Sequence, residues 1–128
     1  MNIPENLRYS KDHEWIAVDG ATATIGITDY AQHSLGDVVY IDLPRAGDKF
    51  GTHEAFGSVE SVKAVSEIFT PVAGEVLEVN ESINDTPEAV NKEPYTDGWM
   101  VKVKMDNPLE ADKMLSSVEY EEYLSANG

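Results

Sequence analysis

The sequence predicts a mainly β domain of sandwich-like or barrel-like form. Three observations support this prediction: short segments rich in β-branched residues recur along the chain, Gly and Pro separate them, and the few helix signals are short. Many short strands at regular spacing are typical of β-sandwiches and barrels. The chain has 128 residues, which is the length of one domain, so we expect a single domain over residues 1–128.

The strand predictions depend on apolar alternation and on the turn residues between the segments. Asp19-Gly20 separates two such segments, and a two-residue Asp-Gly connection is a strong hairpin signal. We expect strands at 15–18, 21–27, 38–43, in consecutive segments between 54 and 80, and within 95–104. Pro71 and Gly74 divide the long β-rich stretch, and a tight turn is expected near Lys63.

The helix predictions depend on capping residues. Thr28 and Gly36 would begin and end a two-turn helix over 28–35. Thr86 followed by Pro87 predicts a short helix over 86–90. Ser116 with Glu119 three residues later forms a capping box, which predicts a C-terminal helix through Leu124. Residues 108–109 read as a connector between the last strand and this helix.

The charge of the chain narrows the classes of partner. There are 24 acidic and 9 basic residues, and the formal net charge is −15. Phosphate recognition depends on clustered Lys and Arg, so we expect neither a nucleic-acid binder nor a protein that binds anionic membranes. Basic or neutral protein surfaces are the expected partners.

Composition and motifs argue against catalysis by this chain. It contains no Cys, which excludes disulfides, Cys-ligated metals and thiol nucleophiles from the polypeptide. No phosphate-binding loop or nucleophile elbow is present. His13, His33 and His53 are spaced twenty residues apart, so we expect no metal site. We therefore expect no catalytic residue and no enzyme activity.

The N-terminal residues resemble neither a signal peptide nor a transit peptide, and no apolar stretch is long enough to span a bilayer. We expect a monomer in the cytoplasm, and a processed mitochondrial form remains an alternative.

One lysine stands apart from the rest. Lys63 lies between two β-rich segments, without a basic neighbour and with Glu60 three positions before it. A lysine at a hairpin turn presents an accessible amine on a rigid base, which suits covalent attachment of an acyl group. By spacing alone, a simple solvent-exposed turn lysine is the more common explanation.

The stretch 57–63 reads Gly-Ser-Val-Glu-Ser-Val-Lys and resembles the lipoyl-attachment motif of the glycine cleavage system H-protein family. Similarity to this family continues along nearly the whole chain, in residues 9–15, 25–32, 35–39, 71–76, 80–81, 94–95 and 98–99. The resemblance implies a barrel-sandwich hybrid of two small antiparallel sheets, with short peripheral helices and a C-terminal helix.

The resemblance also implies a function. A member of this family is a lipoyl-bearing carrier and not an enzyme. It takes an aminomethyl group from a pyridoxal-phosphate glycine decarboxylase to a tetrahydrofolate-dependent aminomethyltransferase, and dihydrolipoamide dehydrogenase then reoxidises it. A lipoate-attaching enzyme is a further implied partner. The absence of Cys is consistent with this role, because both thiols belong to the lipoyl arm.

Carried over residue by residue, the resemblance implies that Lys63 bears lipoate in amide linkage. Asp12, Glu14 and Glu67 match family positions near a cleft that receives the loaded arm, where carboxylates would pair with a cationic amine. Glu60 is a candidate for recognition by the lipoate-attaching enzyme, although a structural role in the turn is an equal alternative.

The sequence departs from the family pattern at one position. Family members often carry His immediately before the Leu-Gly pair, where this chain has Ser34, and a histidine stands one residue earlier as His33. We do not transfer a role in holding the loaded arm to His33.

Two alternatives of other kinds remain open. One is a lipoyl or biotinyl domain of a larger multienzyme complex, although such domains usually carry Asp-Lys-Ala or Met-Lys-Met at the acceptor and sit beside a linker. The other is an unmodified acidic adaptor of lipoyl-like fold that binds only proteins. An enzyme is a third possibility, for which we find no site.

Overall fold

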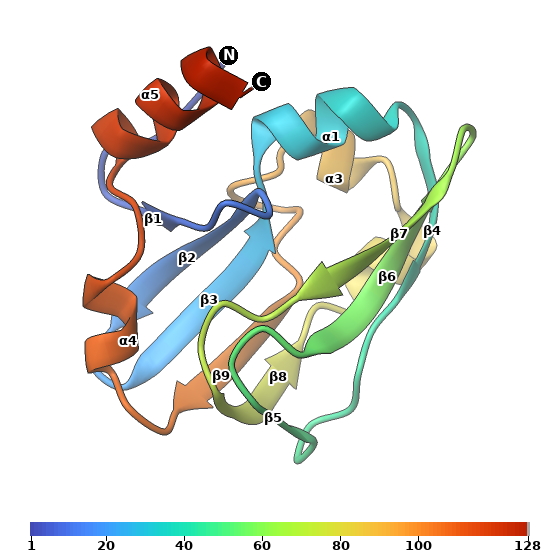
Figure 1. Ribbon diagram of the computed structural model, residues 1–128. Coiled ribbons are helices and arrows are strands. Elements are labelled where there is room, and N and C mark those ends of the chain that lie inside the picture. Colours follow the sequence, from blue (N-terminus) through green and yellow to red (C-terminus); the bar gives the residue numbers. More distant parts are fainter. Residues whose placement is uncertain (128) are drawn as a thin grey trace.

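The computed structural model describes residues 1–127 and contains two antiparallel sheets (Figure 1). The larger sheet has the strand order β1 (Arg8–Tyr9), β2 (Glu14–Asp19), β3 (Thr22–Ile27), β9 (Val101–Met105), β8 (Gly74–Val79) and β5 (Lys49–Phe50). The smaller sheet has the order β4 (Val38–Asp42), β6 (Ala55–Ser61) and β7 (Val65–Phe69).

Five helices surround the sheets within residues 1–127. They are α1 (Asp29–Leu35), α2 (Ser82–Asp85), α3 (Ala89–Lys92), α4 (Leu109–Asp112) and α5 (Ser117–Asn127). In Figure 1, α1 and α3 lie at the end of the molecule where the β6–β7 hairpin projects, and α5 lies beside the N-terminus. This architecture confirms the predicted fold class.

The strongest local signals of the sequence produce the expected elements. β2 and β3 pair across the Asp19-Gly20 turn, where Gly20 adopts a φ of +61°. Thr28 caps α1, because its hydroxyl accepts a hydrogen bond from the Ala31 amide at 3.2 Å. Ser116 and Glu119 form the predicted capping box, with reciprocal bonds of 2.9 and 3.2 Å, and α5 continues three residues beyond the predicted end.

Several short elements differ from the predictions. Residues 108–109 were expected to be a connector, but α4 begins there; β1, β5 and α2 were not predicted. The predicted helix at 86–90 begins later, at Ala89, because Thr86 and Pro87 form turns whose carbonyls accept from Ala89 and Val90. These elements contain two or four residues, too few to produce a recognisable periodicity.

The main core lies between the two sheets. The side chains of β2, β3, β8 and β9 that point inward pack against those of β4, β6 and β7, and the fully buried members include Ile16, Ile25, Ile41, Val59 and Val76. On β9, Val101 and Val103 are buried while Lys104 is exposed, as the alternation predicts.

A second cluster attaches α5 to the larger sheet. The rings of Tyr9 and Tyr120 stack with their centroids 4.7 Å apart, and Leu7 and Trp15 are buried beside them. The C-terminal helix thereby covers the outer part of β1 and β2, next to the segment that carries residues 10–14.

Candidate functional site

Lys63 lies in the turn that joins β6 to β7, and its side chain is exposed. The turn is closed by Ser61, whose hydroxyl oxygen accepts hydrogen bonds from the Lys63 amide at 3.1 Å and the Ala64 amide at 3.2 Å. The Ser61 amide donates to the Ala64 carbonyl at 2.8 Å. The backbone at Lys63 is therefore held by a local network that leaves the amine accessible.

The turn is also tied to the segment between α1 and β4. The Val62 amide donates to the Asp37 carbonyl at 3.0 Å. Asn91 on α3 holds both sides of Asp37, because its amide nitrogen donates to the Gly36 carbonyl at 2.8 Å and its oxygen accepts from the Val38 amide at 2.8 Å. The hairpin tip is therefore hydrogen-bonded to the segment between α1 and β4, and α3 holds that segment in place.

The aliphatic stem of Lys63 lies on Gly36, the residue that caps the C-terminus of α1. A Cβ at Gly36 would come within 3.1 Å of Lys63 Cε and 3.7 Å of Nζ, so a larger residue here would displace the lysine stem by a few tenths of an ångström. Gly36 also has a φ of +80°, which other residues rarely adopt. The stem of Lys63 thereby lies next to the C-terminal end of α1.

A cleft of about 190 Å³ begins at Ser34 and Leu35 and extends between α1, β7 and the segment before β2; we name it the arm cleft. Its lining is mostly apolar, with a polar end formed by carboxylates and an imidazole. The lining residues are Asp12, His13, Glu14, Ile27, Tyr30, Ala31, Ser34, Leu35, Val59, Ser66, Glu67 and Ile68. Asp12, Glu14 and Glu67, far apart in the sequence, are brought together in this one cavity.

Glu14 is the buried carboxylate of the cleft, with only 3% of its surface exposed. The Ser10 hydroxyl donates to Glu14 Oε1 at 2.6 Å, and the Phe69 amide donates to Oε2 at 3.4 Å. Burial raises the pKa of Glu14 to about 7, against the opposing effect of the Ser10 hydrogen bond. Glu14 therefore exchanges a proton near neutral pH, and a nearby cation would favour its ionised form.

Asp12 and Glu67 are exposed and lie on the rim of the cleft. The register places Glu67 opposite Ser58, on the side of β7 that faces away from Ile68. Glu60 lies outside the arm cleft, on the exposed side of β6 opposite Tyr40 and Val65. The three carboxylates of the cleft are thus unequal, and only Glu14 is withdrawn from water.

Ser34 and His33, where the sequence departs from the family pattern, lie in different surroundings. Ser34 lines the arm cleft, whereas His33 is exposed and is not among the lining residues. This supports keeping His33 apart from the cleft.

His13 is a cleft residue that the sequence analysis did not identify. It adopts a φ of +69°, and its ring lies 4.5 Å from that of Tyr30 between centroids. His13 Nδ1 is 2.8 Å from the Tyr120 hydroxyl, which is in turn 2.8 Å from the Thr28 hydroxyl. Burial lowers the pKa of His13 and so favours its neutral ring, which shares a hydrogen bond with the Tyr120 hydroxyl. α5 is thereby linked to the start of α1, a wall of the cleft.

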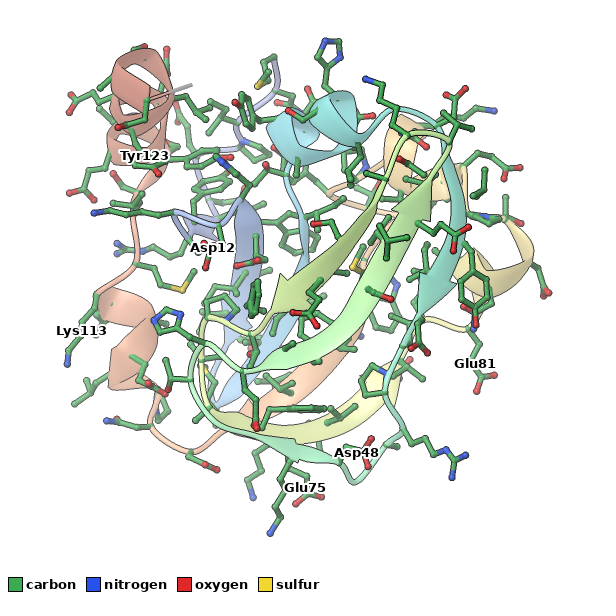
Figure 2. The ribbon with its side chains drawn as sticks, turned by 45° about the vertical axis from the view of Figure 1, so that its right-hand side comes forward. Asp12, Asp48, Glu75, Glu81, Lys113 and Tyr123 are labelled. Carbon is green, nitrogen blue, oxygen red and sulfur yellow. The ribbon has the colours of Figure 1, made fainter. Side chains whose placement is uncertain are left out.

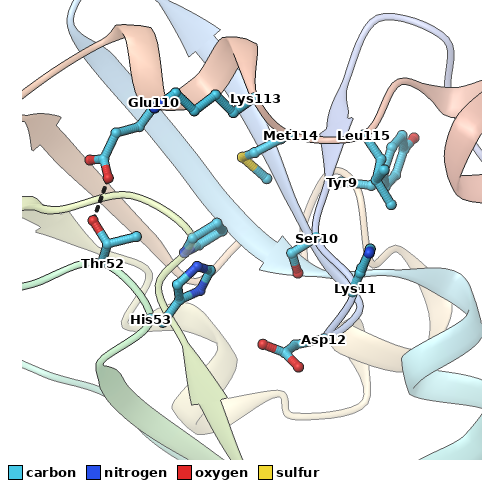
Figure 3. Close-up of a pocket in the computed structure, with 11 residues that line it drawn as sticks. Tyr9, Ser10, Lys11, Asp12, Thr52, His53, Glu110, Lys113, Met114 and Leu115 are labelled. Atoms are coloured by element: carbon cyan, nitrogen blue, oxygen red, sulfur yellow. Dashed lines mark hydrogen bonds between the residues drawn. The ribbon is translucent and has the colours of Figure 1, made fainter.

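Figure 3 shows a neighbouring cavity of about 290 Å³ between α4, β1 and the loop before β6. Asp12 belongs to the lining of both cavities. Glu110 in this second cavity accepts hydrogen bonds from the Thr52 hydroxyl and, at 3.0 Å, from the Ala73 amide. Glu110 therefore fastens α4 to the adjoining loops.

The acidic side chains are spread over the molecule. Figure 2 shows Asp48 and Glu75 at one end, Glu81 on a flank and Asp12 below Tyr123. Within residues 1–127, no three His, Asp or Glu side chains converge as ligands for a metal ion. No helix of that same range is long and apolar enough to cross a membrane.

Comparison with known proteins gives one consistent result. The family model described as "Glycine cleavage H-protein" matches residues 7–127. The chain is 55% identical to the glycine cleavage system H protein of Halothermothrix orenii, over 97% of each chain. It is 52% identical to that of Staphylococcus carnosus, over 97% of this chain and 98% of the other.

A solved structure is similar as well. The crystal structure of a glycine cleavage system H protein from Mycobacterium marinum superposes with a TM-score of 0.85 at 35% identity, and the match covers 98% of this chain and 99% of that chain. The similarity therefore extends over both sheets and the C-terminal helix. The chain belongs to the glycine cleavage H-protein family.

Proposed function

We propose that this chain, as a single domain over residues 1–128, is the lipoyl-bearing carrier of the glycine cleavage system. It carries an aminomethyl group from a pyridoxal-phosphate glycine decarboxylase to a tetrahydrofolate-dependent aminomethyltransferase. Dihydrolipoamide dehydrogenase reoxidises it, and a lipoate-attaching enzyme modifies Lys63. In this role the chain is a substrate of its partners and not a catalyst.

One observation carries the proposal: an exposed lysine on an anchored turn lies against Gly36, and the residues just before Gly36, Ser34 and Leu35, line a cleft that contains the buried carboxylate of Glu14. The hydrogen bonds of Ser61, Asp37 and Asn91 fix the backbone of the turn, which a lysine needed only for solubility would not require.

The residues present suit a lipoyl group. When bound, this group supplies a reducible disulfide, which a chain without Cys cannot provide. Its amide would form on an amine that the fold leaves in water. The apolar lining from Ala31, Leu35, Val59 and Ile68 offers contact for a hydrocarbon chain, and burying each methylene contributes about 0.8 kcal/mol.

The carboxylates of the cleft would favour an arm that ends in a positive charge over a neutral one. Ionised Glu14 would accept a hydrogen bond from a cationic amine at the end of the arm, and its surroundings exclude water from that contact. Asp12 and Glu67 add negative charge at the rim. A contact between the ammonium and exposed Asp12 or Glu67 would contribute only about 0.2–1 kcal/mol, so these rim carboxylates add little beside the apolar contact along the arm.

The test is peptide mass spectrometry around Lys63 after expression with lipoate, together with reconstituted glycine cleavage. We expect the lipoyl mass increment on Lys63. Lys63→Arg keeps the charge but cannot form the amide, and should abolish glycine cleavage. An unmodified Lys63 in a protein that still binds its partners would instead support an adaptor role. Full activity of the Arg variant would contradict the carrier function.

A further inference from the structure

Exposed apolar side chains lie on the smaller sheet and on the turn that carries Lys63. Val39, Tyr40, Val62 and Val65 are 47%, 55%, 67% and 66% exposed, although all four are large hydrophobic side chains. They come from β4, from the turn and from the start of β7, and we name them the tip patch. Exposed apolar groups that lie together on a surface, unlike isolated ones, mark an interaction site.

The register explains how the patch is assembled. Tyr40 lies opposite Glu60, and Glu60 lies opposite Val65, so these three side chains form one row across the outer face of β4, β6 and β7. The register shifts between Val38 and Tyr40, which inserts Val39 as an extra residue and turns it to solvent beside Tyr40.

The patch lies outside the arm cleft. None of its four residues is among those that line the cleft. The core does not need the four side chains either, because the opposite faces of β4 and β6 supply Val38, Ile41 and Val59 to it. The patch is therefore free for a partner protein.

The position of the reacting atom indicates which partner must cover the patch. An enzyme that uses a long arm can work at a distance from the hairpin. An enzyme that acylates Lys63 must bring its reaction centre within bonding distance of Nζ, which lies 3.7 Å from the Cβ position of Gly36. Such an enzyme necessarily covers the surface next to the turn.

The acidic residues near the patch indicate the charge expected on the partner's surface. Glu60 lies in the middle of the row, and Asp42 is exposed two residues beyond Tyr40 on the same side of β4. The whole chain carries a net charge of −15. A complementary surface would combine an apolar recess for Tyr40 and Val65 with a basic rim.

We propose that the tip patch is the docking surface for the acyl-transferring enzyme that modifies Lys63; this inference rests on the proposed function. The enzyme uses an activated acyl donor, a mixed anhydride or a thioester. The Lys63 ammonium gives up one proton, and the amine forms a bond to the acyl carbon. The bond from that carbon to its activating group breaks, and the second amine proton leaves with that group.

The test measures kcat and KM for acylation of the unmodified chain by a lipoate ligase supplied with lipoate and ATP, with intact mass as the readout. Tyr40→Ser and Val65→Ser should each raise KM by about fivefold or more, as expected for side chains at the centre of an interface, with kcat within about twofold of wild type. Raised salt should increase KM for all variants.

Matched controls come from the same chain. Val18 on β2 and Leu77 on β8 are 46% and 47% exposed and lie outside the patch. Val18→Ser and Leu77→Ser should leave KM unchanged, and thermal unfolding of all four variants establishes that they remain folded.

The outcomes separate the two proposals. Failure of the wild-type chain to be acylated at Lys63 would overturn the proposed function. Normal acylation of wild type with equal KM values for patch and control variants would overturn the docking surface alone. If the patch variants, once lipoylated, slow the decarboxylase reaction as much as acylation, the patch is a shared surface and its assignment to the acylating enzyme is wrong.

Discussion

The Ser10 hydroxyl donates a hydrogen bond to Glu14 Oε1 at 2.6 Å, across the bend that leads from β1 into β2. The Glu14 amide donates back to Ser10 Oγ at 3.0 Å, so the two residues fix each other. This pair holds a carboxylate at the end of an apolar cleft although burial disfavours its charge. The protonation state of Glu14 therefore affects both the stability of the fold and the negative charge inside the cleft.

The first prediction concerns stability against pH for Glu14→Gln. The folded-state pKa of Glu14 is about 7, above the ordinary value of 4.5, so the folded protein binds this proton more tightly than the unfolded chain does. Wild-type stability therefore falls relative to the Gln variant as pH rises from about 4.5 to 7, by about 3 kcal/mol in total. Denaturant unfolding of both proteins at pH 4, 6 and 8 measures this difference. A difference that is independent of pH would contradict a buried carboxylate that titrates near neutral pH. Glu121→Gln on α5 serves as the exposed control.

The second prediction follows from the proposed carrier function and concerns retention of the cargo. Only ionised Glu14 can pair with an ammonium, so non-enzymatic release of formaldehyde and ammonia from the loaded wild-type protein should slow as pH rises through about 7. Glu14→Gln should release faster and lose this pH dependence. Glu67→Gln should have the smaller effect, because Glu67 is exposed. Equal release rates for wild type and both variants would mean that neither carboxylate retains the cargo.

The third prediction concerns the base of the lysine turn. Asn91→Asp keeps the acceptor for the Val38 amide but replaces the donor to the Gly36 carbonyl with a carboxylate oxygen. We expect a loss of about 1–3 kcal/mol in unfolding free energy and faster hydrogen exchange of the Val62 amide. Exposed Asn84→Asp on α2 is the matched control. Unchanged protection of Val62 in the Asn91 variant would show that α3 does not support the turn.

The sequence predicted those features that depend on neighbouring residues. The Asp19-Gly20 hairpin, the Thr28 cap and the Ser116–Glu119 capping box are local, and each is present. Strands β1 and β5 contain two residues each, and the pairing partners that define them lie elsewhere in the chain, so no local pattern marks them.

The same distinction between local and long-range signals applies to the residues of the site. Residue spacing alone marked Lys63 as unusual, and the family resemblance pointed to Asp12, Glu14 and Glu67, which the fold brings to one cleft. Ser10 was inside a recognised motif but had no assigned role. Asn91 could not be found, because its partners lie more than fifty residues away in the sequence and nothing near Asn91 indicates them.

The last prediction concerns the link between α5 and the cleft. Tyr120→Phe keeps the ring that stacks on Tyr9 but removes the hydroxyl that bridges His13 Nδ1 and the Thr28 hydroxyl. Both partners would lose a hydrogen bond in a buried position, so the unfolding free energy should fall by about 1–3 kcal/mol. Tyr123→Phe is the control on the same helix: it keeps the half-buried ring and removes only the hydroxyl, so the change should stay within about 0.5 kcal/mol.

The two Tyr variants should also differ in the titration of His13, measured by NMR. A hydrogen bond to the neutral imidazole favours the uncharged ring, so removal of the Tyr120 hydroxyl should raise the His13 pKa toward the ordinary value of 6.5, while Tyr123→Phe should leave it unchanged. Since His13 lines the arm cleft beside Tyr30, a shift of its titration by Tyr120→Phe would mean that the C-terminal helix controls the charge at the polar end of the cleft. An identical His13 titration in both variants would mean that burial alone sets its protonation and that α5 acts only through packing.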